Sequence, residues 1–421
     1  MFKKIINKIT GNAYGYSVFA KLVSVLTGLL YTVLYSRYLG AELRGTASVI
    51  NNYVEMIMLV LCFGAYQAYP YFKKTTGEDK YREFINNVFG MFFVYVGIAA
   101  AFLLIVRPST DVCVITALIP TTLAIKQLNY VVLIENPKIR NTTQIGLELF
   151  DIVFLAVLMI FTEANYFYCI FFLCFRNFVT FVFAIQNLKI NIFTIRPTLK
   201  QIMKYVSYGF VPMLTLVMME INYKVDVIML ERMSVAKAEI GVYSLGVMLA
   251  QKLWMIPDAL RDILTGNLAK GKTEQEVCKI TRLSLWITLA CILGMIVLGK
   301  PIIYLLFGEE YSGAYRVFLN ISLGVIGMVF YKMIYAYNVV NGHKNINFVL
   351  LFTAAAANVV LNYFLIKTMS INGAAIASMI SYTICGLSFL VYFIRITKIS
   401  LKEILLIKKE DITGLISYIR K

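Results

Sequence analysis

FINNVFGMFFVYVGIAAAFLLIV, residues 84–106, is apolar from Val88 to its end. A hydrocarbon core about 30 Å thick needs roughly 20 apolar residues per helix, and this stretch is long enough. Comparable stretches recur between short loops rich in Lys, Arg, Asn, Pro or Gly. Twelve are expected, at 16–36, 47–70, 84–106, 112–134, 142–162, 164–187, 205–230, 239–264, 282–299, 316–340, 346–367 and 372–395. They predict an all-α integral membrane protein of about twelve transmembrane helices.

The composition excludes a soluble enzyme and a disordered scaffold. Hydrophobic residues make up 60% of the 421 residues, charged residues 15%, and the mean hydropathy is +0.75, against an apolar share nearer half in soluble chains. Seven cysteines, an odd number, indicate no disulfide framework. A single histidine and no Cys-x-x-Cys pair argue against a zinc site, so no cofactor or structural metal is expected.

The basic residues predict the orientation, because Lys and Arg are retained on the cytoplasmic side. The formal charge is +17. Summed over alternate loops, most Lys and Arg fall on the side that holds both termini, which places both termini in the cytoplasm and removes the need for a nucleic-acid partner. The first span begins too late and runs too long for a secretory signal, so we expect it to be retained. The stretch 398–421 alternates apolar and charged positions, which fits a helix on the inner membrane surface or a frayed polar tail.

An internal repeat divides the chain into halves. At an offset of about 196, Arg37–Gly45 superposes on Arg232–Gly241, each a short outer loop that ends in glycine before a helix. The expected domains are an N-terminal six-helix bundle at 1–190, a cytoplasmic linker at 191–204, a C-terminal six-helix bundle at 205–396 and a basic tail at 397–421. Because each repeat holds an even number of helices, a pseudo-two-fold axis along the membrane normal is expected, with a substrate path between the bundles.

Cations inside the spans favour a transporter. A charged side chain at a span centre costs at least about 2.5–3.5 kcal/mol on insertion scales, so it normally faces a bundle interior or a water-filled cavity. The candidates for a cationic, substrate-binding cavity are Lys21, Lys126, Arg176, Lys224, Lys252 and Lys332. Such a cavity favours an anionic substrate, because phosphate oxygens accept charge-assisted hydrogen bonds. Snorkelling to the membrane surface is the competing interpretation for Lys21 and Lys224.

Oxygen-bearing side chains in the spans suggest ion coupling. The candidates are Glu55, Asp226, Asn358, Asn362 and Ser378, which could complete a Na⁺ site or a proton-linked switch. Asn and Ser also hydrogen-bond between membrane helices, so a structural role is an open alternative. Glu148 with Asp151, and Glu220 with Lys224, share helix faces and are as readily explained as structural pairs.

Catalytic motifs are lacking in the sequence. No Gly-x-x-x-x-Gly-Lys-Ser/Thr loop occurs, so the energy for transport would come from an ion gradient, a substrate gradient or a partner. A membrane polysaccharide polymerase is the leading enzyme alternative, but it would need a large outer loop or a soluble domain, and no loop exceeds roughly 20 residues by the span assignment. Transport is therefore preferred to catalysis.

Five segments carry a family resemblance. They are SRYLGAELRGTASVI (36–50), YSLGVMLAQKLWMIPDAL (243–260), PIIYLLFGEEYSGAYRVF (301–318), NVVLNYFLI (358–366) and INGAAIASMISY (371–382). In this order they resemble the multidrug/oligosaccharidyl-lipid/polysaccharide (MOP) exporter superfamily, specifically the bacterial flippases for O-antigen or capsule repeat units. Twelve spans favour these oligosaccharide flippases over the lipid II flippase of the same superfamily.

The resemblance implies a function, partners and site residues. It implies a MATE-like monomer in the bacterial cytoplasmic membrane that flips undecaprenyl-pyrophosphate-linked oligosaccharide by alternating access, beside a polysaccharide polymerase and a chain-length regulator. Lys252 falls where a cavity arginine is expected, and Asp226, Asn358, Asn362 and Ser378 fall on sodium-site positions. Asn362 replaces an acidic ligand and Ser378 a threonine, so Na⁺, H⁺ or neither is left open. An ion-coupled drug or metabolite antiporter and a non-transporting scaffold are the competing hypotheses.

Overall fold

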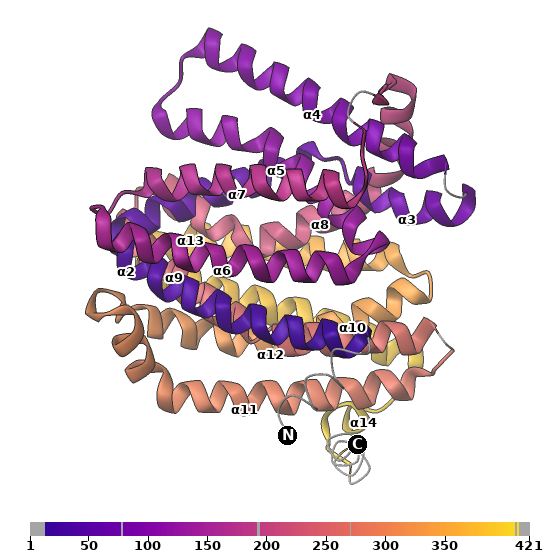
Figure 1. The fold of residues 1–421 in the computed structure, drawn as a ribbon. Helices are drawn as coiled ribbons and strands as arrows, with labels where there is room; N and C mark the ends of the chain where they lie inside the picture. Colours follow the sequence, from indigo (N-terminus) through magenta and orange to yellow (C-terminus); the bar gives the residue numbers. More distant parts are fainter. Residues whose placement is uncertain (1–12, 77–78, 192–193, 270, 409–410, 412–421) are drawn as a thin grey trace, which may run out of the picture. The chain divides into compact units, whose positions relative to one another are not determined.

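The computed structural model describes residues 13–76, 79–191, 194–269, 271–408 and 411. These residues contain helices and no strand (Figure 1), which suits lipid because a helix satisfies its own backbone hydrogen bonds. Among them, nine helices are long and apolar enough to cross a membrane, or ten when the bent pair Val23–Leu61 and Ala65–Lys73 is counted as one span. The prediction of an all-α, multi-pass membrane protein is confirmed.

Two long helices account for the difference between ten and twelve spans. Helix α2 (Ala13–Leu61) contains a non-helical residue at Gly40, with φ 69° and ψ 176°. Helix α13 (Lys344–Thr397) contains one at Ser370, with φ 49° and ψ −131°. Each kink lies between two predicted spans, so dividing both helices there adds two segments to the ten, and the twelve predicted segments are recovered.

The chain forms two compact units, Met1–Val217 and Met218–Lys421. The division falls inside α8 (Leu199–Arg232), which is one continuous helix. The expected linker at 191–204 lies before this point, and its described part is a short loop leading into the first turn of α8. A helix that begins in one unit and ends in the other therefore joins the two.

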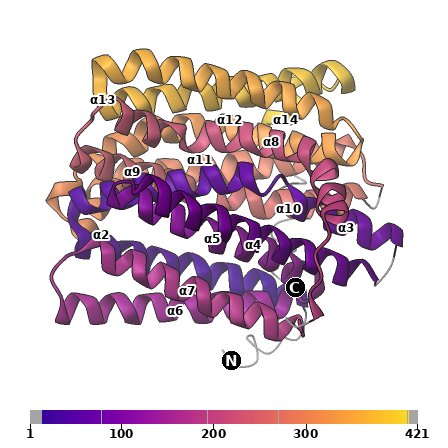
Figure 2. The same ribbon diagram turned by 90° about the horizontal axis from the view of Figure 1, so that it is seen from above.

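Unit 1 is built around α5 (Thr110–Glu135), which packs against α2, α4 (Asp79–Val106) and α7 (Tyr166–Asn187). Figures 1 and 2 show α4 beside α5 and α2 beside α6 (Pro137–Phe161). Asn136 separates α5 from α6 and caps α6 by accepting a hydrogen bond from the Ile139 N–H at 3.2 Å. The rings of Phe154 and Phe172 stack at 3.7 Å between α6 and α7. Helices α5, α6 and α7 all contact one another.

The second predicted span, 47–70, is wrong as a single helix. Helix α2 ends at Leu61, and α3 (Ala65–Thr76) starts after a break, bent by 47°. Gly64 has φ +63°, and a Cβ on Gly209 of α8 would lie 2.4 Å from backbone atoms of Gly64. The Tyr95 hydroxyl donates to the carbonyl of Leu61 at 2.8 Å, which satisfies a group that the break exposes. Close backbone packing at two glycines therefore allows the break.

Unit 2 is centred on α12 (Ala314–Val340), which packs against α9 (Lys237–Lys252), α10 (Met255–Ala269), α11 (Glu274–Phe307) and α13. The short helix η2 (Glu309–Tyr311) connects α11 to α12. Figure 1 shows α11 running beside α12. A Cβ on Gly386 of α13 would lie 2.0 Å from the carbonyl oxygen of Gly327 on α12, so only glycine permits this approach.

The predicted span 239–264 is also divided. Helix α9 ends at Lys252 and α10 begins at Met255, so the break precedes Pro257, which lies in the first turn of α10. Proline is tolerated there because the first-turn N–H groups have no partner within the helix. Pro120 and Pro212 lie inside α5 and α8, which continue through them. The break is therefore adjacent to one proline, and the other two do not end their helices.

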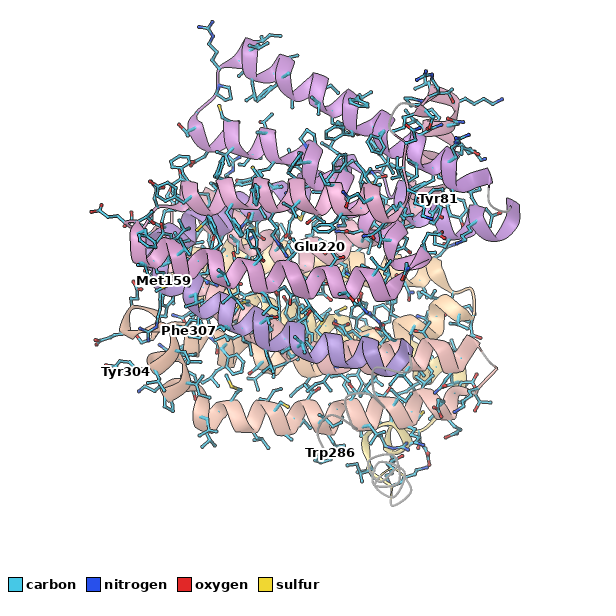
Figure 3. All side chains as sticks on the ribbon, viewed as in Figure 1. Tyr81, Met159, Glu220, Trp286, Tyr304 and Phe307 are labelled. Carbon is cyan, nitrogen blue, oxygen red and sulfur yellow. The ribbon has the colours of Figure 1, made fainter. Side chains whose placement is uncertain are left out.

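Many apolar side chains point away from the protein. Met159, Trp286 and Tyr304 are 40%, 45% and 58% exposed, and Figure 3 shows them on their helices. A soluble monomer rarely exposes a contiguous apolar surface of this kind, whereas lipid accepts it. Burial in the membrane therefore accounts for the high mean hydropathy.

In the segment 398–421, which was predicted to be amphipathic, the structure describes only one short helix. Helix α14 covers Leu401–Leu405 only, and 409–410 and 412–421 lie outside the described residues. Arg282 of α11, buried at 4% exposure, forms two hydrogen bonds with the carboxylate of Asp411, at 2.8 and 3.0 Å. The Trp286 indole N–H donates to the Leu405 carbonyl at 3.0 Å. The segment after α13 is therefore anchored on α11 by polar contacts.

Candidate functional site

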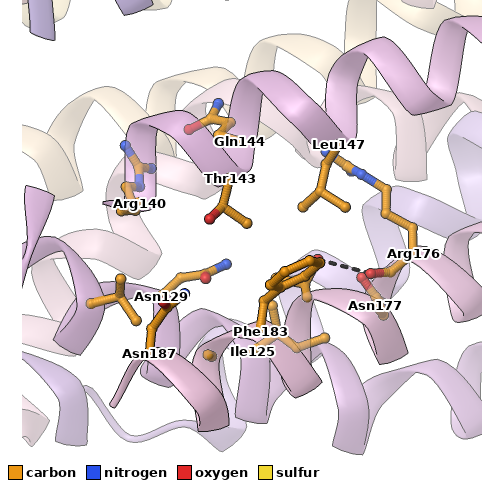
Figure 4. Close-up of a pocket in the computed structure, with 13 residues that line it drawn as sticks. Ile125, Asn129, Arg140, Thr143, Gln144, Leu147, Arg176, Asn177, Phe183 and Asn187 are labelled. Carbon is orange, nitrogen blue, oxygen red and sulfur yellow. Dashed lines mark hydrogen bonds between the residues drawn. The ribbon is translucent and has the colours of Figure 1, made fainter. Parts of the chain in front are cut away.

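A cavity of about 240 Å³ lies between α5, α6 and α7 of unit 1 (Figure 4). Its lining is mainly polar or cationic rather than aliphatic. The lining residues are Ile125, Asn129 and Val132 of α5, Arg140, Thr143, Gln144 and Leu147 of α6, and Arg176, Asn177, Thr180, Phe183, Ala184 and Asn187 of α7. We call it the α5–α6–α7 cavity.

Helical spacing places these side chains on common faces. On α7, residues 177, 180, 184 and 187 follow one another at three or four positions, the spacing of one helix face. On α6, Arg140 and Gln144 are four apart. Asn165 starts α7 by accepting a hydrogen bond from the Phe167 N–H at 2.9 Å. The cap and the spacing together orient the polar stripe of α7 into the cavity.

Arg176 is held in the cavity wall by Asp151. Its Nε lies 3.1 Å from Asp151 Oδ2, and the carboxylate is only 8% exposed. The geometry is not that of an aligned hydrogen bond, since Arg176 Nε and Asp151 Oδ1 both lack a hydrogen-bond partner. The ion pair therefore neutralises the two charges in the cavity wall.

Arg140 lines the same cavity but, unlike Arg176, has no carboxylate partner among the described residues. Within the part of the chain described, it forms no ion pair within 4 Å, and its Nη1 contacts Asn141 Oδ1 at 3.4 Å. One helical turn below Gln144, Glu148 accepts hydrogen bonds from the Gln144 amide at 3.0 Å and the Thr27 hydroxyl at 2.6 Å. Arg140 is thus a guanidinium whose donors are available to an acceptor-rich ligand.

A second group of charged residues lies in unit 2. Lys332 of α12 is 5% exposed, and its ammonium lies 2.6 Å from Asp258 of α10. Arg261 binds the same carboxylate at 3.0 Å and Asp262 at 3.1 Å. The Lys332 ammonium is also 5.1 Å from the centroid of the Trp254 ring. Two cations and two carboxylates thus neutralise one another.

Three of the six predicted cavity cations are paired with a carboxylate, and one of these pairs, Glu220 with Lys224, was suggested by the sequence. Arg176, Lys224 and Lys332 each have a carboxylate partner, with Glu220 lying 2.9 Å from Lys224. A buried charge requires this, because removing an unpaired ion from water costs several kcal/mol. Lys126 lies 5.9 Å from the Tyr66 ring. Lys252 is the last residue of α9, and the side chain of Lys21 lies outside the described residues.

Asp226 of α8 is the centre of a buried polar cluster in unit 2. Its carboxylate, 1% exposed, accepts hydrogen bonds from the hydroxyls of Tyr243 and of Ser378, the latter at 3.0 Å, and from the Val227 N–H at 2.9 Å. Among the described residues, no cation pairs with it. The buried carboxylate is therefore stabilised by hydrogen bonds alone.

The two asparagines and a second serine extend this cluster. Asn362 donates to Asn358 Oδ1 at 2.9 Å, Asn358 donates to Ser381 Oγ at 3.0 Å, and Ser381 donates to Asn222 Oδ1 at 2.8 Å. The oxygen Oδ1 of Asn362 is buried without a hydrogen-bond partner. A hard cation prefers oxygen ligands. Among the residues that the structure describes, this cluster offers a carboxylate that has no cationic partner and an amide oxygen that has no hydrogen-bond donor.

The structure thus brings together four of the five candidates for ion coupling: Asp226, Asn358, Asn362 and Ser378. The fifth, Glu55, lies on an exposed face of α2 in unit 1. The sequence does not identify Arg140 as a cavity residue, because it falls between the predicted spans 112–134 and 142–162. The four-residue spacing of Arg140 and Gln144, and the polar stripe on α7, were the signals that could have identified this site.

Searches against family models and against curated proteins found no match. Solved structures do match. The lipid II flippase MurJ, in an inward closed conformation, gives a TM-score of 0.76 at 14% identity over 96% of this chain and 92% of that one. An inward-facing MATE family transporter of the MOP superfamily gives 0.59 at 11% identity, covering 88% and 94% of the two chains. A variant of the Vibrio cholerae MATE transporter VcmN gives 0.60 at 13% identity, covering 92% and 97%.

Identities this low establish the fold alone. The chain therefore has the fold shared by the lipid II flippase MurJ and by MATE family transporters of the MOP superfamily.

Proposed function

We propose that this chain is a flippase that moves undecaprenyl-pyrophosphate-linked oligosaccharide repeat units from the cytoplasmic to the outer leaflet of a bacterial cytoplasmic membrane. The observation that carries the proposal is the α5–α6–α7 cavity, where Arg140 and Arg176 lie among amide side chains inside a membrane-spanning bundle. Guanidinium groups suit phosphate oxygens, and amides and hydroxyls suit sugars. The likeness in fold to the lipid II flippase MurJ supports the same class of cargo.

The proposed mechanism assigns separate tasks to the two arginines. Arg140 donates to the anionic head of the cargo. Arg176 neutralises Asp151 and adds a second guanidinium to the cavity wall. The prenyl chain stays in lipid while the cavity opens alternately to the two sides of the membrane. A difference in affinity between the two states would let the cargo bind on one side of the membrane and leave on the other.

The Asp226 cluster is the proposed coupling site. Asp226, Asn362 and Ser378 would contribute oxygens to a Na⁺ ion, or Asp226 would carry a proton. Either ligand neutralises a buried carboxylate, so binding would change the stability of the contacts between α8 and α13. We also propose that both termini are cytoplasmic and that the flippase acts as a monomer beside a polymerase and a chain-length regulator.

An antiporter for cationic drugs is the second candidate function. The carboxylates Glu148 and Asp151, which adjoin the same cavity, favour it, since they would attract a cation if their partners moved. The two functions predict opposite effects of removing Arg140. A flippase loses affinity for its cargo, whereas a cation antiporter loses a repulsive charge.

The test uses proteoliposomes that carry lipid-linked oligosaccharide on one face and a membrane-impermeant glycosidase on the other. Protein-dependent cleavage is expected, and Arg140→Ala should reduce it at least tenfold. Arg395→Ala, an exposed arginine in the last turn of α13, is the matched control and should leave the rate unchanged. Absence of cleavage by folded protein under both Na⁺ and pH gradients contradicts the proposal.

A further inference from the structure

A second cavity, of about 460 Å³, lies at one end of unit 1. It is formed where α3, α5 and α7 end and α4 begins, and its polar lining consists of Tyr69, Lys73, Tyr81, Glu135, Asn187 and Lys189. We call it the Lys189 cavity. Asn187 also lines the α5–α6–α7 cavity, so one side chain forms part of both walls.

The one carboxylate that lines the Lys189 cavity is already paired with a cation. Glu135 Oε1 accepts hydrogen bonds from the Tyr69 hydroxyl and from the Lys73 ammonium, the latter at 2.5 Å. The Tyr81 hydroxyl donates to the Leu188 carbonyl at 2.7 Å. The carboxylate is therefore neutralised within the wall, and the two tyrosines are held in place by protein contacts.

The remaining donors are cationic or amide groups. Lys189 is exposed and forms no ion pair with any residue that the structure describes. Lys73 keeps two N–H groups after its bond to Glu135, and the Asn187 amide supplies two more. Two lysines against one glutamate leave the lining with one net positive charge. A surplus of donors and a net positive charge suit an anion rich in acceptor oxygens.

Lys189 lies in the turn that follows α7 and its C-cap residue Leu188. It adopts φ 50°, a left-handed conformation, and its N–H donates to the Gln186 carbonyl at 3.1 Å. Glycine or asparagine is the usual residue at such a position.

We propose that the Lys189 cavity binds a phosphate group, carried by an anionic lipid head group or by a soluble phosphate. Lys189 and Lys73 supply the charge, and Asn187 supplies neutral donors. The site differs from the α5–α6–α7 cavity in its lysines and in its open position beyond the helix ends. Binding here does not depend on flipping, so it can be measured whether or not the proposed function holds.

The test titrates purified full-length protein, in a zwitterionic detergent, with inorganic pyrophosphate by calorimetry. Lys189→Ala should weaken binding about tenfold to a hundredfold, as expected for one lost charge-assisted hydrogen bond. Lys398→Ala is the matched control, because Lys398 is also an exposed lysine with a left-handed backbone that ends a helix, with φ 59°, and it lines neither cavity. Its affinity should equal that of the unmodified chain.

Two comparisons decide the result. If Lys189→Ala and Lys398→Ala bind equally well, or if Arg140→Ala alone abolishes binding, the proposal is overturned. Repeating the titration in nanodiscs identifies the source of the phosphate. Weaker pyrophosphate binding in phosphatidylglycerol than in phosphatidylcholine nanodiscs, with the difference lost in Lys189→Ala, supports a lipid head group. Equal binding in both lipids, still sensitive to Lys189→Ala, supports a soluble phosphate.

Discussion

The Ser378 hydroxyl donates to Asp226 Oδ2 at 3.0 Å, joining α13 to α8 across 152 positions of sequence. Both side chains are fully buried or nearly so, at 0% and 1% exposure. A carboxylate in this position has lost its water, and hydroxyl and backbone donors replace it. The contact therefore ties the stability of unit 2 to the charge state of one residue.

Replacement of Asp226 by Asn should abolish a specific response to the coupling ion. If Na⁺ binds here, the midpoint of thermal unfolding should rise when KCl is replaced by NaCl at equal ionic strength. At a Na⁺ concentration a hundred times the dissociation constant, the free energy of unfolding should increase by about 2.7 kcal/mol. Asp226→Asn should eliminate the difference between the two salts. An unchanged Na⁺ response in this variant would exclude Asp226 as a ligand, and Glu55→Gln serves as the comparison.

The ion pair between Arg176 and Asp151 predicts a rescue experiment. Arg176→Ala leaves a nearly buried carboxylate without its cation, so we expect a loss of about 3–5 kcal/mol in the free energy of unfolding. Arg176→Ala combined with Asp151→Asn should recover most of that loss, because no charge is left unpaired. Thermal unfolding in detergent measures both. Additive losses in the double variant would show that the two side chains act independently.

Asp258 pairs with both Lys332 and Arg261, so replacing Asp258 and replacing Lys332 should destabilise the protein by different amounts. Lys332→Met leaves Asp258 with Arg261 at 3.0 Å, whereas Asp258→Asn leaves the ammonium of a 6%-exposed lysine without a carboxylate. We expect Asp258→Asn to be the more destabilising, by about 3–5 kcal/mol against less than about 2 kcal/mol for Lys332→Met. Unfolding followed by chemical denaturant compares them. The reverse order would mean that Lys332 has another compensating partner.

The anchored tail should respond to acid. Burial raises the pKa of the Asp411 carboxyl, but hydrogen bonds from Arg282 and the Lys408 backbone outweigh this effect, so its pKa lies below its usual value. The contact therefore contributes its full stability above pH 4, roughly the pKa of an unfolded Asp, and loses it as the pH falls through the lower folded value. Hydrogen exchange of residues 401–408 should be slow at pH 7 and increase below about pH 4, beyond the intrinsic pH dependence of exchange.

Asp411→Asn provides the control for this experiment. It removes the negative charge at every pH, so exchange in 401–408 should be fast at pH 7 as well. Lys408→Ala, which removes the 2.5 Å contact with Glu403 but leaves the carboxylate of Asp411 intact, should have a smaller effect. Protection that persists in Asp411→Asn would show that the Trp286 and Leu405 contact alone holds the segment.

The helices were predictable because each membrane span is a local property. A run such as 84–106 must form a helix in lipid whatever its neighbours are, since its backbone has no other hydrogen-bond partners. The breaks were less predictable. The end of α2 at Leu61 depends on the contact between Gly64 and Gly209, which are far apart in sequence, and no local pattern reports it.

The candidate sites, too, were predictable in part from the sequence. Asp226, Asn358, Asn362 and Ser378 were selected from the sequence by their polar character and by family resemblance, and the structure places them in one cluster. The pair of Glu220 with Lys224 was suggested by the sequence, but the carboxylate partners of Arg176 and Lys332 were not. Asp258 is 74 positions from Lys332 and belongs to a different helix, so only the packing of α10 against α12 reveals the pair.

The sequence by itself determined that this chain crosses a membrane many times, because apolar length and composition decide the partition of each helix into lipid. It also supplied the buried polar groups that any transport path would need. The tertiary structure alone decided which of those groups neutralise one another, where the helices break, and that Arg140, Arg176 and four amide side chains share a cavity. Those outcomes depend on distances between residues far apart in the chain, which burial and charge pairing set only once the helices have packed.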